Sequence, residues 1–385
     1  MTIMKIVIAP DSFKGSVTAK EAAQLMTIGM KRVFPEANYE LVPMADGGEG
    51  TVQSLVDATH GRFITTTVHD PLGRKIAAKY GLLGDHKTAV IEMAAASGME
   101  LMQQEELNPL VTTTYGTGEL IKSALNHNVE KILIGIGGSA TVDGGAGMAQ
   151  ALGAQLLDKK GKELAWGGGA LDKLEQIDIT EIDPRINHTQ IQIASDVTNP
   201  LTGKNGAATV FGPQKGATPT MVNSLDKNLH HYARLITRDL GIDVELSSGA
   251  GAAGGLGAGL LAFCHAQLKA GVNLVINTVK LKQRAQDADI VLTGEGKIDF
   301  QTQYGKTPFG VAHATKSVAP HAPVIVLAGN IGKGVDALYS TDGIDAIFST
   351  PTGAKPLKQA LTDTEHDISQ TAEEVGRLIK AFMHP

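Results

Sequence analysis

A repeated pairing of a short apolar run with a glycine-containing acidic loop is the feature that most constrains the fold of this chain. Apolar runs at 5–9 and 39–43 are each followed by such a loop, and the loops lead into helical patterns over 18–33 and 51–58. A strand, loop and helix that follow one another twice predict a parallel sheet, because parallel strands need a long crossover that a helix supplies. We therefore expect an α/β fold.

The same alternation returns near the C-terminal end, which indicates a discontinuous domain. Three strands are predicted there, over 289–293, 323–328 and 345–349. The middle of the chain has a different character, with a hairpin turn and many glycines. A chain of 385 residues suggests two or three domains. We predict two α/β domains, one inserted into the other, with an active-site cleft between them. The first domain comprises residues 1–65 and 285–385, and the inserted domain comprises residues 66–284.

Charge and aromatic content argue against several classes of partner. Lysine and arginine total 34 against 40 aspartates and glutamates, which gives a net charge of −6, and only 4% of the residues are aromatic. Such a chain is a poor general binder of nucleic acid or of an anionic membrane. The single cysteine, Cys264, excludes an intrachain disulfide and a cysteine-rich zinc site. We expect no nucleic-acid partner and no membrane partner.

The N-terminal residues do not resemble a secretory signal, because the apolar run 6–9 is too short and ends at Pro10. The longest apolar stretch without charge, 249–264, is rich in glycine and too short to span a bilayer. These observations predict a cytoplasmic enzyme. The sequence leaves the oligomeric state open, a homodimer included.

Clustered glycine is the clearest sign of chemistry in the sequence. The sharpest cluster, 135–145, follows a predicted strand and leads into a short helix. The backbone N–H groups of such a loop, together with the positive end of a helix, form an anion site. Ser139 and Thr141 would add hydroxyl donors, and Asp143 could hold a cation. The loop therefore predicts contact with phosphate.

Five predicted strand ends carry a carboxylate beside glycine, lysine or hydroxyl residues. They are the loops 10–15, 46–51, 137–145, 195–200 and 294–299. Ligands of open α/β sheets bind at the carboxyl ends of the strands, and carboxylates there suit Mg²⁺. Two lysines lie in comparable places, Lys215 in a turn and Lys306 at a predicted helix start. The sequence at Lys306 is not a Walker A motif, because Phe300 occupies the position of the first glycine.

Seven segments resemble, in sequence and in order, the bacterial glycerate kinase family of type I. The matching segments are 8–15, 45–51, 137–141, 196–201, 211–217, 249–255 and 294–299. The resemblance implies ATP-dependent phosphorylation of D-glycerate with Mg²⁺, with 2-phosphoglycerate as the product, and two α/β domains with the site between them. Three positions depart from the family's usual residues. Val142 replaces an asparagine, Ser195 a common cysteine, and Phe300 a smaller residue.

The residues and the resemblance together give a hypothesis for the site. Phosphoryl transfer needs cradled phosphates, a metal ion and a positioned hydroxyl. We assign catalysis to Asp196, Asp46 and Lys14. The other assignments are Asp11, Ser12, Lys215, Asn199 and Gly251 for substrate binding; Gly137, Gly138, Ser139, Thr141, Asp143 and Lys306 for ATP binding; and Glu295 and Asp299 for Mg²⁺.

Other functions stay open on the sequence alone. The protein could phosphorylate a different small hydroxy acid, or it could form 3-phosphoglycerate. Gly135, Gly137 and Ala140, with Asp158 further on, loosely match a dinucleotide fingerprint, so an NAD-dependent hydroxy-acid dehydrogenase is a second alternative. A non-catalytic sensor of a small acid is a third.

Overall fold

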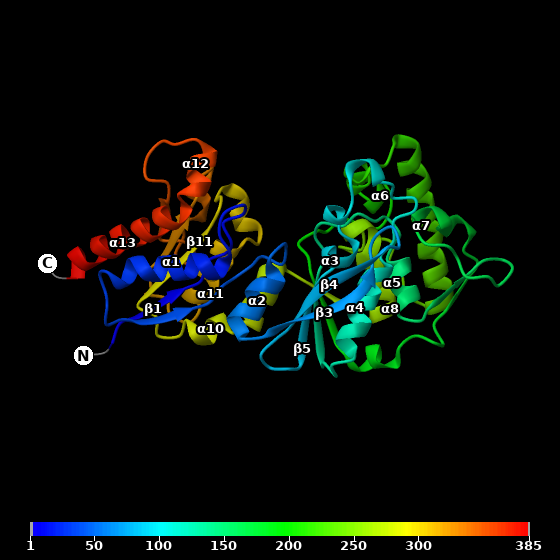
Figure 1. Ribbon diagram of the computed structural model, residues 1–385, viewed down its shortest axis with the longest axis horizontal. Helices are drawn as coiled ribbons and strands as arrows, with labels where there is room; N and C mark the ends of the chain where they lie inside the picture. The colour runs from blue at the N-terminus through cyan, green and yellow to red at the C-terminus, as the bar shows by residue number, and fades with distance from the viewer. Residues whose placement is uncertain (1–2, 384–385) are drawn as a thin grey trace. The chain divides into compact units, whose positions relative to one another are not determined.

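The chain folds into two compact units. The computed structural model describes residues 3–383 (Figure 1). One unit, called here the terminal unit, combines Met1–His60 with Ala270–Pro385; the other, the central unit, is Gly61–Lys269. Among residues 3–383, no helix is both long and apolar enough to cross a membrane.

The terminal unit is built on a parallel sheet. Its strand order is β13-β12-β11-β1-β2, and each neighbouring pair is parallel. The strands are β1 (Lys5–Ile8), β2 (Asn38–Leu41), β11 (Ile290–Glu295), β12 (Val324–Ala328) and β13 (Ala346–Ser349). Every residue of β11 and β12 is buried, because helices cover both faces of a parallel sheet and leave room only for apolar runs. The predicted α/β class is confirmed.

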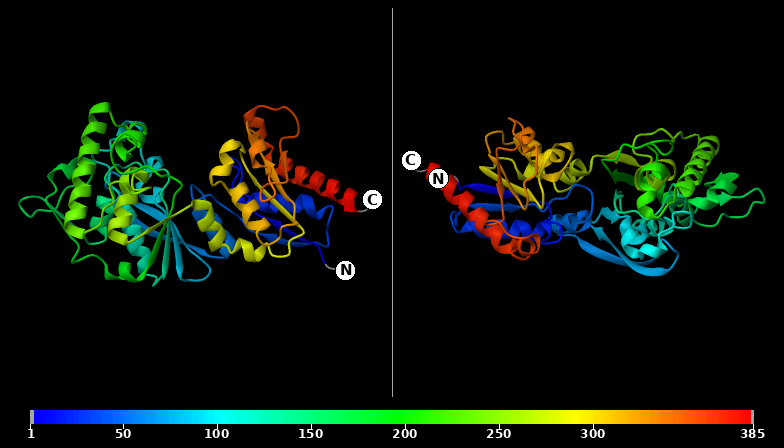
Figure 2. Two further views of the ribbon diagram at one scale, coloured as in Figure 1. Left: turned by 180° about the vertical axis from the view of Figure 1, so that it is seen from behind. Right: turned by 90° about the horizontal axis from the view of Figure 1, so that it is seen from above.

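Helices flank this sheet, and one pair packs unusually closely. They are α1 (Ala19–Lys31), α2 (Thr51–Thr59), α9 (Gly271–Thr278), α10 (Leu281–Arg284), α11 (Thr307–Lys316), α12 (Leu357–Thr362) and α13 (Thr364–Met383). Figures 1 and 2 show α13, in red, beside α1, in blue. A Cβ atom at Gly29 of α1 would lie 2.1 Å from the carbonyl oxygen of Ser369 in α13, so only glycine permits this approach. The two ends of the chain are thus joined in one core.

The central unit contains a mixed sheet of order β10-β9-β6-β5-β4-β3. The strands are β3 (Arg62–His69), β4 (Lys75–Leu82), β5 (Thr88–Glu92), β6 (Lys131–Gly135), β9 (Gln190–Ala194) and β10 (Gln267–Lys269). β3 and β4 form the predicted antiparallel hairpin, and β5, β6, β9 and β10 run parallel. A separate antiparallel pair joins β7 (Gln155–Leu157) to β8 (Gln176–Asp178). The carboxyl ends of β6 and β9 therefore meet at one edge of the sheet.

Six α-helices are described in the central unit. They are α3 (Ala94–Ser97), α4 (Tyr115–Leu125), α5 (Ala146–Ala151), α6 (Ala207–Phe211), α7 (Pro219–Leu240) and α8 (Leu256–Cys264). α7 begins at Pro219 behind the capping residue Thr218 and ends at Gly241, whose φ of 74° suits glycine. Its buried face joins a single large core with β5, β6 and β9. The long polar-faced helix predicted over 219–240 is confirmed.

Both boundaries between the units differ from the prediction: residues 61–65 belong to the central unit, and the second boundary lies further from its predicted place. The sequence placed residues 270–284 in the inserted domain, whereas the structure gives them to the terminal unit. Helices α9 and α10 pack against α11, and Arg284 Nε pairs with Glu40 Oε1 at 2.5 Å. The next strand pattern in the sequence begins only at 289, so the sequence predicted the second domain boundary at 285, too late in the chain.

Candidate active site

The terminal unit has a topological switch point between β1 and β11. After β1 the chain moves to β2 on one side, and β11 pairs with β1 on the other side. In open α/β sheets, ligands bind outside the carboxyl ends of the strands at such a point. Asp11 follows β1 and Glu295 ends β11, so the fold places two predicted site carboxylates at this edge.

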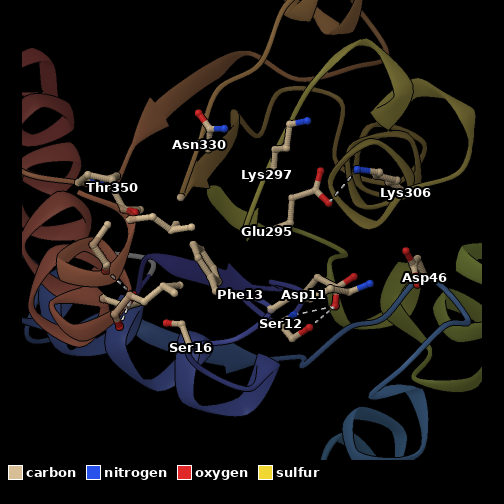
Figure 3. Close-up of a pocket in the computed structure, with 18 residues that line it drawn as sticks. Asp11, Ser12, Phe13, Ser16, Asp46, Glu295, Lys297, Lys306, Asn330 and Thr350 are labelled. Carbon is tan, nitrogen blue, oxygen red and sulfur yellow. Dashed lines mark hydrogen bonds and ion pairs between the residues drawn. The ribbon is translucent and has the colours of Figure 1, made fainter. Parts of the chain in front are cut away.

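A cavity of about 390 Å³ lies at this edge (Figure 3). Loops following β1, β2, β11, β12 and β13 all contribute to its wall, together with α12. It brings together six residues that the sequence assigned to the site: Asp11, Ser12, Lys14, Asp46, Glu295 and Lys306. Lys306 is the N-cap residue of α11, which confirms the predicted lysine at a helix start.

Asp11 is a buried carboxylate that accepts hydrogen bonds from Thr307 and from the backbone and hydroxyl of Ser12. The Thr307 hydroxyl donates to Oδ2 at 2.5 Å, and the Ser12 backbone N–H donates to Oδ1 at 2.6 Å. Burial raises the pKa of Asp11 to about 6, the Thr307 bond opposes that rise, and the charge of Asp46 adds to it. Near neutral pH this carboxylate can therefore both accept and release a proton.

Glu295 faces the same cavity in a similar electrostatic setting. Thr302 donates its hydroxyl to Oε1 at 3.1 Å, and Lys306 Nζ lies 3.8 Å from Oε2. Burial raises the pKa of Glu295 to about 7, while Lys306 and Thr302 lower it and the charges of Asp11 and Asp46 raise it. The charges of Asp11 and Asp46 thus disfavour the ionisation of Glu295, with Lys306 as a partial counter-charge.

The two residues predicted to bind Mg²⁺, Glu295 and Asp299, do not both line the cavity. Glu295 lines it, but Asp299 does not; it caps the 3₁₀ turn Phe300–Tyr304 by accepting from Gln301 N at 3.0 Å. Its other oxygen lies 3.1 Å from Lys297 Nζ. Among the residues that the structure describes, no three histidine, cysteine or acidic side chains form a ready metal cluster. The carboxylates that act electrostatically on Glu295 are instead Asp11 and Asp46.

In the central unit, the glycine loop follows β6 as predicted. Gly137 and Gly138 are exposed, whereas Ser139 and Thr141 are buried. Only the first part of the loop therefore offers backbone to a ligand. Val142, where the family usually has asparagine, is fully buried in the core of the unit, so this substitution changes packing and not an exposed surface.

Lys215 lies beneath this loop and is almost fully buried. Its Nζ donates to Ser139 Oγ at 2.5 Å and to the carbonyl oxygen of Thr141 at 2.8 Å. Burial lowers the pKa of Lys215 to about 7, partly offset by the charge of Asp143. Lys215, which the sequence assigned to substrate binding, thus stabilises the glycine loop through hydrogen bonds on its buried side.

Asp143 is also enclosed. Its carboxylate accepts bonds from the backbone and hydroxyl of Thr114, at 2.8 and 2.9 Å, and from the N–H groups of Gly145 and Gly147, at 3.1 and 3.3 Å. Burial raises its pKa. With no exposed surface and both oxygens engaged, Asp143 organises the loop and the start of α5; the predicted contact with ATP has no surface through which to occur.

Asp196 lies in the loop after β9, next to the edge that carries the glycine loop. Gly135 of β6 pairs in register with Ala194 of β9, so the two loops emerge side by side. Asp196 itself is exposed. Asn199 and Gly251 support this loop internally: Asn199 Nδ2 donates to the carbonyl oxygen of Asn205 at 2.8 Å, and Gly251 N donates to that of Asn199 at 2.9 Å.

The cavity also contains residues that sequence reasoning missed. Asn330 follows β12 directly after Gly329, the same strand-end signal that identified the other loops. Thr307 does not line the cavity, and only its hydrogen bond to Asp11, between remote segments, shows that it belongs to the site. Leu357 and Leu361 of α12 carry no local signal, because two leucines on a short helix look like ordinary core residues.

Comparison with known proteins agrees with this architecture. The sequence matches the glycerate kinase family over residues 6–380. It is 53% identical to a glycerate kinase of Bacillus subtilis (strain 168), covering 98% of each chain, and 50% identical to the glycerate 2-kinase of Escherichia coli (strain K12), covering 99% of each. The crystal structure of a Salmonella typhimurium LT2 protein named glycerate kinase 2 superposes with a TM-score of 0.92 at 49% identity, with 100% of both chains covered.

The α/β fold gathers acidic and basic side chains at its strand ends, and glycerate kinases match it along the whole chain. The protein is therefore a kinase that transfers phosphate to an alcohol group. The chain belongs to the glycerate kinase family. The resemblance noted in the seven sequence segments is thereby confirmed.

Proposed function

We propose that the protein is an ATP-dependent glycerate kinase that phosphorylates D-glycerate at its 2-hydroxyl to give 2-phosphoglycerate. The observation that carries the proposal is the cavity at the β1/β11 switch point, where Asp11, Asp46 and Glu295 lie with Lys14 and Lys306. Lysines suit a carboxylate or phosphate, and a carboxylate near its pKa suits the proton of a hydroxyl. The E. coli relative at 50% identity is named for the 2-position.

Mg²⁺ fits this residue set. Oxygen ligands are what Mg²⁺ prefers, and the like charges of Asp11, Asp46 and Glu295 would be relieved by a divalent cation. Bound there, Mg²⁺ would neutralise charge on the phosphate oxygens. Glu295 and Asp46 are the residues we assign to hold it, and Asp299 keeps a supporting role through its cap on the following turn.

The transfer itself asks the protein chiefly to position groups and to accept one proton. Asp11 would accept the proton of the glycerate 2-hydroxyl as that oxygen attacks the terminal phosphorus of ATP and the bond to the bridging oxygen breaks, releasing ADP. Lys14 and Lys306 would stabilise negative charge on the substrates. In the central unit taken by itself, we propose a phosphate contact for the exposed backbone of Gly137 and Gly138 and a substrate contact for the exposed Asp196.

A coupled assay tests this function. Purified protein is incubated with D-glycerate, ATP and Mg²⁺; ADP release is followed, and the product is offered to enolase without a mutase. ADP release with direct enolase turnover is the expected result. ADP release without enolase turnover would mean 3-phosphorylation, and no ADP release would overturn the proposal and direct the search to other small acids and then to nicotinamide binding.

A further inference from the structure

The cavity of the terminal unit has two chemically different ends. Figure 3 places Lys306 and Glu295 at one end and Thr350 at the other, with Phe13 between them. The segment after β13 and helix α12 add four apolar residues to the wall, Pro351, Leu357, Ala360 and Leu361, together with Thr350 and Thr364. A ligand that fills the whole cavity must therefore carry charge at one end and an apolar surface at the other.

The apolar wall is formed by α12, a six-residue helix whose leucines are not buried. Leu357 is 75% exposed and Leu361 is 39% exposed, yet both line the cavity. Residues 357, 360 and 361 follow the i, i+3, i+4 spacing that puts side chains on one helix face. This face presents apolar area that a flat apolar ligand would remove from water.

Ion pairs hold α12 in its place at the cavity. Lys355 precedes α12 in the chain and contacts Asp363 Oδ2 at 2.9 Å and Asp367 Oδ2 at 2.8 Å. Both carboxylates follow the C-terminal end of α12. Asp367 is buried, so the pair anchors the helix to α13. The leucine face is thus a fixed wall on an anchored element.

Glycerate does not account for this wall. A three-carbon hydroxy acid is charged or hydroxylated on every carbon and has no apolar face to place against leucine and phenylalanine. A cavity of about 390 Å³ is within the range that accommodates larger organic ligands. A nucleoside triphosphate has the required asymmetry, a polyanionic end and a flat aromatic base.

We propose that the apolar end of this cavity is the base-binding subsite for the nucleotide, with Leu357 and Leu361 packing on one face of the purine and Phe13 lying beneath it. The phosphates then extend toward Lys14 and Lys306. The proposal rests on the proposed function in taking ATP as the phosphate donor. It makes Leu357 a specificity-determining residue that touches only the nucleotide.

The test compares four proteins: wild type, Leu357→Asp, Leu357→Met and Leu378→Asp. Leu378 is an exposed leucine of α13 outside the cavity and serves as the matched control. For Leu357→Asp we expect KM for ATP and the Kd for ADP, measured by calorimetry, to rise at least tenfold, with KM for D-glycerate and Tm unchanged. Leu378→Asp should remain near wild type in all four quantities, and Leu357→Met, which keeps an apolar side chain, should lose less ADP affinity than Leu357→Asp.

Two results would overturn the subsite. One is a Leu357→Asp protein whose Kd for ADP stays within twofold of wild type. The other is a rise in KM for D-glycerate alone, which would mean that D-glycerate, and not the nucleotide, binds at this end of the cavity. Failure of the proposed function would look different: the wild type would release no ADP with D-glycerate, while the calorimetric comparison of ADP binding would still decide the subsite.

Discussion

The hydroxyl of Thr307 donates a 2.5 Å hydrogen bond to Oδ2 of Asp11, which joins the first residue of α11 to the loop after β1. The two residues are 296 positions apart in sequence. The bond favours the ionised carboxylate while burial disfavours it, and the balance leaves the pKa of Asp11 at about 6. The proton affinity of the proposed base is therefore set by an element from the other end of the chain.

Removing this bond should shift the pH dependence of the reaction. In Thr307→Val, only the Ser12 backbone bond and the Lys14 charge would still oppose burial, so the pKa of Asp11 should rise and the acid limb of kcat/KM should move to higher pH by roughly 0.5–1 unit. Loss of the donor to a buried carboxylate should also cost about 1–3 kcal/mol of stability. Thr307→Ser keeps the donor and should keep the wild-type profile. An unmoved acid limb in Thr307→Val would remove Asp11 from the proton transfer.

Glu295→Gln should make the protein more stable at high pH while it removes activity. The folded pKa of Glu295, about 7, lies above the ordinary value of 4.5. Between these values the native state holds a proton that the unfolded state releases, so this group's contribution to stability falls as pH rises from 4.5 through 7. Glutamine cannot ionise, and Tm of the variant relative to wild type should rise between pH 5 and pH 8, with kcat reduced at least 100-fold.

The control for that experiment is Glu374→Gln, on an exposed position of α13. Its Tm difference from wild type should stay constant over the same pH range. If the Glu295→Gln difference were equally flat, burial of the Glu295 charge would not be a cost to the fold.

The sequence predicted those parts of the site whose signal is local. Asp11, Asp46 and Glu295 each follow or end an apolar strand beside glycine or hydroxyl residues, and the parallel sheet then brings these loops to one edge. The α/β class followed from the same alternation. Site residues in loops after strands can thus be predicted from sequence, because the carboxyl ends of parallel strands lie at the same edge of the sheet.

The predictions that need revision concern residues whose environment is set by distant packing. Lys215 and Asp143 look like surface charges in sequence, but Lys215 is buried against Thr141 of the glycine loop and Asp143 against Thr114. Asp299 lies in an acidic loop but serves as a cap. In the opposite direction, Leu357 looks like a core residue and is exposed at the cavity. Burial depends on contacts between remote segments, which spacing alone does not encode.

Lys215 should leave a signature in the pH dependence of stability. Its folded pKa of about 7 lies below the ordinary 10.5, so between these values the unfolded state binds more protons and stability rises with pH. Lys215→Met lacks this gain. Urea unfolding at pH 7 and pH 9.5 should show the variant losing roughly 1–3 kcal/mol relative to wild type over the interval. Lys227→Met, at an exposed position of α7, should show a constant difference.

Gly254 should tolerate no side chain because it lies against the glycine loop. Its φ is +70°, and a Cβ atom would fall 1.8 Å from the carbonyl oxygen of Thr141. Gly241 has nearly the same φ, +74°, with no heavy atom within 4 Å of a Cβ. Gly241→Ala should therefore cost about 1 kcal/mol, for backbone strain alone, whereas Gly254→Ala should cost about 4 kcal/mol or more. Equal losses in chemical denaturation would show that the contact with Thr141 relaxes freely.

Asp196→Asn separates catalysis from folding most directly. The residue is exposed at the loop after β9, so an isosteric amide should leave the free energy of unfolding within about 0.5 kcal/mol of wild type. If the carboxylate contacts the substrate, kcat should fall about 10²–10⁴-fold, because the amide cannot supply the negative charge. Asp172→Asn, an exposed aspartate in the 3₁₀ turn Gly168–Lys173 of the same unit, should retain wild-type kcat. A wild-type kcat in Asp196→Asn would remove this residue from the catalytic set.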